Sequence, residues 1–299
     1  MSMACNTSGN HNTASGSYSL MCNTSGIRNT AFGYRALNYN TTGTCNTAVG
    51  MYSLQMNTTG TENVAVGYRS LCKNTTGNDN TSVGFQSLHE NTTGCYNNAS
   101  GYLALYSNTT GGWNTATGSN ALKENTTGSY NVALGLCALC ANTTGGYNTA
   151  TGAYALLATT TGCWNTAYGY QALCGNTTGQ ENVGIGFMAL CGNTTGANNT
   201  AVGIYASRAN TTGSYNTAIG RCALAANTTS SYNTAIGRNA GCSNTTGTCN
   251  VYVGYGANGS ATINNVVAIG CGASATATND FILGNSSHVV DIPSAKLTI

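Results

Sequence analysis

Hydrophobic and polar positions along the chain recur with a period of 17 residues. A tetrapeptide close to Asn-Thr-Thr-Gly starts at Asn6 and returns at that spacing, without insertion or deletion, until Asn244. The repeat reads N-T-T-G-x-x-N-T-A-x-G-x-x-A-L-x-x, and its positions are numbered here from the first Asn. A period this short has no room for a strand plus a full helix. It predicts one coil of a parallel β-solenoid, with each repeat stacked on the last.

The regular columns of the repeat predict the interior of the coil. Leu occupies position 15 from Leu20 to Leu190, and Ala occupies position 9 in nearly every repeat. We expect both columns to point inward and to form the apolar core. Position 7 is Asn in every repeat, and we expect its amides to bond from coil to coil, as amide ladders do in stacked sheets. The predicted ladder residues include Asn12, Asn29, Asn46, Asn63, Asn97, Asn114, Asn131, Asn148, Leu37, Leu54, Leu71 and Leu105.

Other positions predict corners and outer faces. Gly at positions 4 and 11 is expected at corners that need positive φ. Charges within the repeats fall only at positions 6, 12, 13, 16 and 17, which should therefore face solvent. Aromatic residues from Tyr96 to Trp164 share position 6 and predict a partly exposed stripe. That stripe fits packing between coils or chains, and it also fits a surface that binds glycans.

Composition narrows the class of protein further. Charged residues make up 5% of the chain and the net charge is +2. We therefore expect no strong electrostatic attraction to nucleic acid or anionic lipid. No apolar run is long enough to insert into a membrane, and no signal peptide is visible. The 14 Cys residues instead suit an oxidising setting. Release of a cell-assembled protein by lysis would reconcile these signals, and so would a mature form whose leader is missing.

The domain organisation follows the repeat. Residues 1–5 are expected to form an N-terminal cap, and residues 6–249 a solenoid domain of about fifteen coils. Residues 250–299 read as divergent coils followed by a C-terminal tail. One Leu and one or two Ala per coil make a thin core, and open ends expose strand edges. Close packing with copies of the same chain, as a trimer, would relieve both problems.

The segment from Asn265 to Ala275 resembles the N-x-V-A-I-G-x-x-A-x-A motif of YadA-like head repeats in trimeric autotransporter adhesins. The main repeat, at Asn46–Leu54 and Asn216–Leu224, is similar to a longer form of it, and related repeats occur in phage and virus tail fibres. The resemblance implies a trimeric, left-handed parallel β-roll used for attachment, outside the cell or on a virion surface. The 17-residue period and the high Cys content depart from the usual head repeat.

Candidate chemistry is sparse. The three His residues lie far apart in the register, and no repeated carboxylate pair is available for acid–base work. The segment Gly254–Gly259 matches G-x-G-x-x-G, but no helix can follow it, so we interpret it as turns. Cys137 and Cys140 form a C-x-x-C without the second pair that a zinc site needs. We therefore expect no enzyme activity, no cofactor and no metal.

Two possible modifications follow from the register. Cys5 and Cys22 share one position in neighbouring coils, as do Cys174 and Cys191, and stacking would bring their Cα atoms to about 5 Å, within disulfide range. Interchain disulfides and free thiols are the alternatives. Asn at position 1 starts a sequon in nearly every repeat, although turn chemistry also explains it. The candidate glycosylation sites include Asn40, Asn57, Asn74, Asn91, Asn108, Asn125 and Asn142.

These features predict a structural or adhesive fibre shaft, either a viral tail fibre or a trimeric adhesin. Its partners would be copies of itself and a cell-surface glycan or receptor, with no nucleic acid. The alternative is a glycosylated extracellular filament subunit that polymerises end to end.

Overall fold

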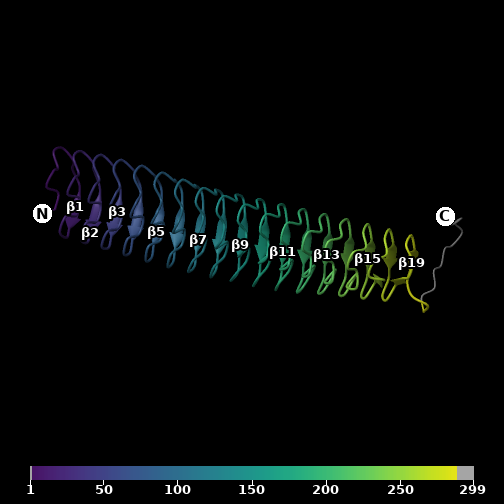
Figure 1. Cartoon of the computed structure of the whole chain (residues 1–299). Coiled ribbons are helices and arrows are strands. Elements are labelled where there is room, and N and C mark those ends of the chain that lie inside the picture. Colours follow the sequence, from purple (N-terminus) through teal and green to yellow (C-terminus); the bar gives the residue numbers. More distant parts are fainter. Residues whose placement is uncertain (1, 288–299) are drawn as a thin grey trace, which may run out of the picture. The chain divides into compact units, whose positions relative to one another are not determined.

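The computed structural model describes residues 2–287, and every regular element among them is a short β-strand. Met1 of the predicted cap and residues 288–299 of the predicted tail lie outside the described residues. The chain falls into two compact units, Met1–Thr178 and Gly179–Ile299. Within each unit, the coils stack one upon the next (Figure 1). The prediction of an all-β parallel solenoid is confirmed, whereas nothing in the repeat indicated the boundary between the units.

Each regular coil contributes one strand, which covers repeat positions 8 to 10, whereas β16 and β18 of the final coils form a separate two-stranded sheet. The strands of the first unit are β1 (Thr13–Ser15), β2 (Thr30–Phe32), β3 (Thr47–Val49), β4 (Val64–Val66), β5 (Thr81–Val83), β6 (Asn98–Ser100), β7 (Thr115–Thr117), β8 (Val132–Leu134), β9 (Thr149–Thr151) and β10 (Thr166–Tyr168). Those of the second unit are β11 (Val183–Ile185), β12 (Thr200–Val202), β13 (Thr217–Ile219), β14 (Thr234–Ile236), β15 (Val251–Val253), β16 (Asn258–Gly259), β17 (Val267–Ile269), β18 (Ser274–Ala275) and β19 (Phe281–Leu283).

Neighbouring strands pair in parallel and in register. In β2 and β3, for example, Ala31 lies opposite Ala48 and Phe32 lies opposite Val49. Because side chains alternate along a strand, the central Ala points inward and its two neighbours point outward. A shift of one residue in the pairing of two strands would turn the inward Ala outward, so the spacing between strands must keep this register.

The core of each regular coil is small and consists of the same few positions. Ala at position 9, Ala or Ser at position 14 and Leu at position 15 are fully buried in most coils. The four predicted core leucines, at 37, 54, 71 and 105, all have zero exposure. Every predicted Asn of the position 7 ladder is buried except Asn12, which lies in the first coil and is half-buried.

The two glycine columns serve different purposes. Gly at position 11 has positive φ, as predicted, with 131° at Gly50. Gly at position 4 does not, so the prediction of a positive-φ corner there is wrong. Its requirement is space, because a Cβ on Gly43 would overlap the Oδ1 of Asn40 and the carbonyl oxygen of Gly60. The other positive-φ corners carry ordinary side chains at positions 6, 13 and 15, including Leu37 at 50°. Such a conformation costs about 1–2 kcal/mol, which stacking against neighbouring coils must offset.

The last coils of the second unit are built differently. Val251 pairs with Val267 and Val267 with Phe281, so these coils are shorter than the regular repeat. Gly241 replaces the core Leu and Tyr252 replaces the core Ala, and the two changes compensate. A Cβ on Gly241 would lie 2.6 Å from Cδ2 of Tyr252, so the Tyr ring fills the space that Leu occupies elsewhere. Burial raises the pKa of Tyr252 to about 12.

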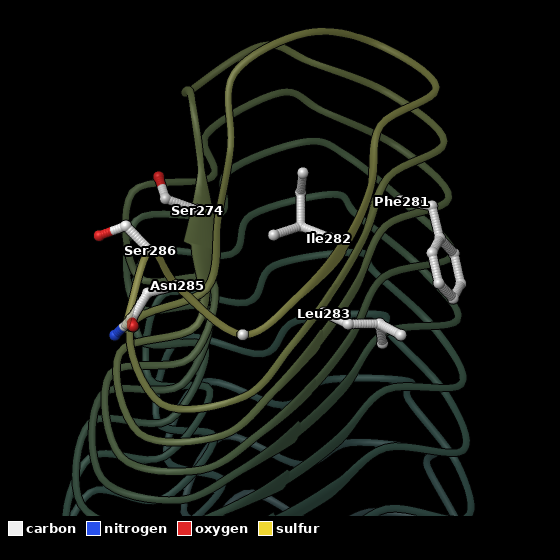
Figure 2. Close-up of a pocket in the computed structure, with 8 residues that line it drawn as sticks. Ser274, Phe281, Ile282, Leu283, Asn285 and Ser286 are labelled. Atoms are coloured by element: carbon white, nitrogen blue, oxygen red, sulfur yellow. The ribbon is translucent and has the colours of Figure 1, made fainter. Parts of the chain in front are cut away.

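The final described coil ends in a shallow pocket. Ile282 of β19 points into the interior of the coil, while Phe281 and Leu283 point outward (Figure 2). Gly272, Ser274 and Gly284 complete the lining together with these residues, Asn285 and Ser286. This end therefore continues the inward and outward alternation of the regular strands.

Candidate functional site: ladders and outer faces

Two columns of Asn amides, rather than the single predicted column, run through the interior. At position 7, Asn46 donates from its Nδ2 to Oδ1 of Asn29 (3.2 Å) and to the Gly60 carbonyl (2.8 Å). The backbone N–H of Asn46 also donates to the same Oδ1 (3.0 Å). At position 1, Asn40 donates from Nδ2 to Oδ1 of Asn23 (2.8 Å) and to the Gly43 carbonyl (3.0 Å). These bonds give the buried amides their hydrogen-bond partners. Without partners, burial of the amides would lower the stability of the folded chain.

The second ladder corrects the prediction of glycosylation at position 1. Asn40, Asn57, Asn74, Asn91, Asn108, Asn125 and Asn142 all have zero exposure. In Asn142, for example, Nδ2 donates to Asn125 (2.7 Å) and to Gly145 (2.9 Å), so both amide protons are used. A glycan would replace one of these protons in a space closed to solvent. The folded coil and N-glycosylation at these seven positions therefore exclude each other.

The position 1 ladder is interrupted at Thr159, which stands where the other coils have Asn. The Oδ1 of Asn142 and the Oγ1 of Thr159 are both buried and have no hydrogen-bond partner. Because the Thr hydroxyl is shorter than an amide, it does not reach the neighbouring coil. This site is a local defect in an otherwise continuous ladder of the first unit.

Another outer feature is a double column of mainly apolar side chains at positions 10 and 12, on either side of the position 11 Gly, which Ser, Thr or Arg interrupts in some coils. We call it the apolar strip. Val83 and Phe85 in one coil are 40% and 44% exposed. In the first unit, the exposed members are Phe32, Val49, Met51, Val83, Phe85, Tyr102, Leu134, Leu136, Tyr168 and Tyr170. In the second unit, they are Ile185, Phe187, Ile204, Ile219, Ile236 and Tyr255. The repeat pattern did not reveal this strip, because the identity of its residues changes from coil to coil.

The aromatic stripe at position 6 is a stack of rings. From Tyr96 through Trp113, Tyr130 and Tyr147 to Trp164, consecutive ring centres lie 4.8 to 5.8 Å apart and the planes are nearly parallel. The three inner rings are stacked on both faces, although 44–53% of the surface of each residue in the stack remains exposed. Sugars bind aromatic residues through ring faces, so this arrangement favours packing between coils over glycan binding.

The cysteine pairs stand at equivalent places in neighbouring coils. Cys5 and Cys22 are thiols in the structure, and burial, with a smaller contribution from Cys5, raises the pKa of Cys22. Cys174 and Cys191 are each half-buried. Disulfides within either pair stay a prediction. Elsewhere, burial and then the adjacent Cys137 thiol raise the pKa of Cys140 to about 11, which disfavours a reactive thiolate there.

The His, Cys, Asp and Glu side chains of residues 2–287 lie apart from one another in most places. Within this range, no three His, Cys, Asp or Glu side chains come close enough together to hold a metal ion. His11 bonds Asn10, and His89 bonds Glu90, in different coils. The same part of the chain contains no helix that is long and apolar enough to cross a membrane.

Comparison of the chain with family models, curated proteins and solved structures finds no match. The similarity to YadA-like and tail-fibre repeats therefore stays a prediction that depends on the sequence motif alone.

Proposed function

We propose that this chain is the shaft of a non-enzymatic fibre that packs side by side with copies of itself, as a homotrimer, and carries or forms an attachment surface. The apolar strip is the observation that supports this most strongly. Soluble monomers seldom expose a contiguous run of large apolar side chains unless it mediates an interaction.

A second copy of the chain is the partner that fits the strip best. Its exposed side chains stand at the same two repeat positions, although some coils carry Thr, Ser or Arg there, and a copy of the chain has the same axial repeat. Contacts between two copies can therefore recur at multiples of the coil spacing, which a partner without this repeat cannot match. Burying a half-exposed Phe or Ile contributes about 1 kcal/mol. Several such contacts offset an association cost of roughly 4–15 kcal/mol.

A place outside the cell or on a virion surface is part of the proposal. The motif resemblance supports it, and so does the low charge of the chain, in which 5% of the residues are charged. In such a shaft, stacked backbone hydrogen bonds and buried Asn ladders would resist extension, while a tip contacts a receptor.

The oligomeric state tests this proposal directly. We expect native mass spectrometry to show a trimer for the unmodified chain and a monomer for the variant Val83→Glu/Phe85→Glu. Thr76→Glu, which adds a charge at an exposed position in the same coil, should stay trimeric. A monomeric unmodified chain, or a strip variant that stays trimeric, would overturn lateral packing. Filaments of indefinite length in electron micrographs would favour end-to-end polymerisation instead.

A further inference from the structure

A shallow groove lies on a different outer face of the first unit, between position 13 and positions 16 and 17 of the repeat. Its main lining residues are Arg35, Tyr52, Gln55, Met56, Arg69 and Lys73, and it holds about 470 Å³. Position 13 adjoins the apolar strip, because Arg35 and Arg69 lie over the position 12 rings of Tyr34 and Tyr68. Positions 16 and 17 lie outside the strip.

Two guanidinium groups in the groove are held in place without being neutralised. The Arg35 guanidinium lies 5.7 Å from the ring centre of Tyr18 and 5.4 Å from that of Tyr34. The Arg69 guanidinium lies 5.5 Å from Tyr52 and 5.3 Å from Tyr68. Contact with an aromatic face orients a cation and leaves its N–H donors available. Among the described residues, neither Arg forms an ion pair with a carboxylate.

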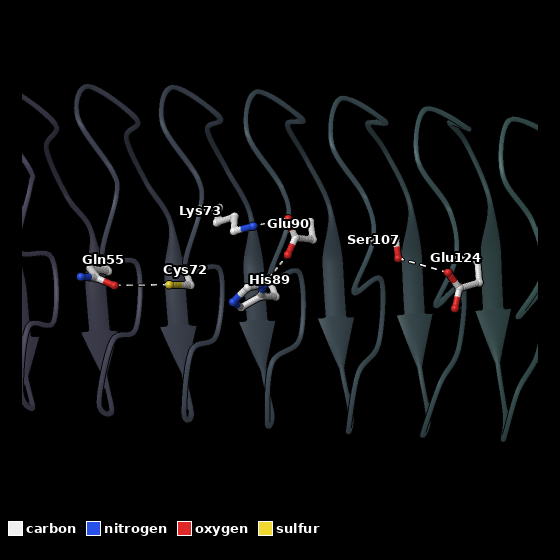
Figure 3. Close-up of polar contacts among 7 residues, drawn as sticks. All are labelled: Gln55, Cys72, Lys73, His89, Glu90, Ser107 and Glu124. Carbon is white, nitrogen blue, oxygen red and sulfur yellow. Dashed lines mark hydrogen bonds and ion pairs between the residues drawn. The ribbon is translucent and has the colours of Figure 1, made fainter.

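The carboxylate of Glu90, which contacts the groove residues Lys73 and His89, is already engaged by these two side chains (Figure 3). Glu90 accepts from Lys73 Nζ at 2.6 Å and contacts His89 Nδ1 at 2.8 Å. Burial raises the pKa of Glu90, but the bonds from Lys73 and His89 more than offset this, so its pKa is lowered overall. The negative charge of Glu90 thus balances Lys73, and the two arginines remain uncompensated.

We propose that this groove binds the acidic groups, carboxylate or sulfate, of an oligosaccharide. The planar Arg fork matches such oxyanions and binds them with two hydrogen bonds. Arg35 and Arg69 share position 13 two coils apart, which corresponds to about 10 Å at the strand spacing. One chain with acidic groups on alternate sugars can span that distance. The Gln55 amide is placed to bond sugar hydroxyls, and Met56 offers an apolar contact for a sugar ring.

A nucleic acid fits the groove less well. Proteins that bind nucleic acid tightly neutralise many phosphates, typically about 6–10 contacts. Only two uncompensated cations line this groove, and the net charge of the whole chain is +2. A short ligand with few, regularly spaced charges is the better match.

The second unit contains a matched comparison groove at the same repeat positions. Arg208 lies over Tyr205 at 5.2 Å, but Ala209, Ala225 and Ala226 stand where the first groove has polar or longer side chains. This groove has a single Arg and should bind acidic sugars weakly or not at all. The two grooves differ in the Arg pair and in the Ala residues, and the variants below separate the contribution of the Arg pair.

Isothermal titration calorimetry on the full chain can test the proposal. The probes are a heparin tetrasaccharide, an oligogalacturonate, neutral maltotetraose and an oligoglutamate of matched charge. We expect saturable binding of the two acidic sugars only. The variant Arg35→Gln/Arg69→Gln should weaken it at least about tenfold, because two charge-assisted hydrogen-bond sites are lost. Arg208→Gln/Arg221→Gln removes the same charge elsewhere and should bind as the unmodified chain does.

A third variant separates geometry from charge and from misfolding. Arg35→Lys/Arg69→Lys keeps both charges and should still lose several-fold in affinity, because Lys lacks the planar fork. Equal binding by the unmodified chain and the Gln variant, full affinity in the Lys variant, or equal binding of maltotetraose would overturn the proposal. Equal binding of oligoglutamate would replace it with a general acidic-peptide site.

Discussion

The regular coils of the first unit and the final coils of the second unit stack the same backbone around different interiors. In the first unit, Leu and Ala fill the core between two ladders of Asn. In the final coils of the second unit, Gly241 replaces the core Leu and Tyr252 replaces the core Ala. Val266 stands where the regular coils have the ladder Asn. Gly254 nevertheless keeps the same positive φ, 128°, as its equivalents. The comparison shows that backbone stacking and the position 11 corner define the fold, whereas the core can change if volumes compensate.

The ladders also differ between these regions. In the first unit, Asn114 both receives bonds from Asn131 and donates to Gly128, so its amide is fully used. At the end of the second unit, Asn250 accepts from the backbone N–H of Val266 (3.0 Å), and the ladder stops there without leaving this oxygen unpaired. An Asn ladder can thus end where the backbone N–H of the next coil still donates to the last Oδ1, whereas a gap within a ladder leaves buried polar atoms unpaired, as Thr159 does.

The largest expected effect is a gap in the middle of the ladder. Asn114→Ala would remove the oxygen that accepts from both the backbone N–H and the Nδ2 of Asn131. Each buried unsatisfied group costs about 1–3 kcal/mol, so we expect a loss of roughly 2–6 kcal/mol in the free energy of unfolding. Thr110→Ala, at an exposed position of the same coil, is the control and should change it little. Urea denaturation followed by circular dichroism measures both, and equal stability of the two variants would contradict the ladder.

A double-mutant cycle tests the compensating pair in the second unit. Tyr252→Ala should cost about 3–5 kcal/mol because it leaves a cavity. Gly241→Leu should cost about 1–3 kcal/mol because the new side chain overlaps the Tyr ring. The double variant restores the Leu and Ala of a regular coil, so most of the stability should return. Losses that simply add in the double variant would show that the two residues do not share one space.

The smallest expected effect is the repair of the defect in the first unit. Thr159→Asn would supply the donor that Oδ1 of Asn142 lacks and would remove a buried, unpaired hydroxyl. We expect stabilisation by about 1–2 kcal/mol, seen as a higher urea midpoint. The control, Thr161→Asn, makes the same change at an exposed position and should be nearly neutral. A Thr159→Asn variant that is less stable than the parent would show that the ladder cannot continue through this coil.

The sequence was sufficient to predict the period, the register of the coils and the Leu core, because each follows from the 17-residue spacing of the repeat. The Asn at position 1 was interpreted as a turn residue or a glycosylation site, because Asn-Thr-Thr-Gly fits both. Asn recurs at position 1 almost as regularly as at position 7, and this recurrence could have indicated a second ladder. The apolar strip could not be recognised from a recurring residue type, because Val83, Phe85 and Leu134 share only large apolar side chains and exposure to solvent. The Arg groove depends on contacts between coils, such as Arg69 over Tyr52, that appear only after stacking.

Hydrogen exchange of side-chain amides, followed by nuclear magnetic resonance, tests the central claim most directly. If the coils stack in register around two Asn ladders, the Nδ2 protons of Asn40 and Asn114 should exchange only when their unit opens. The exposed amide of Gln180 should exchange at the rate of a free peptide. Comparable, rapid exchange at all three side chains would contradict the stacked, amide-sealed interior.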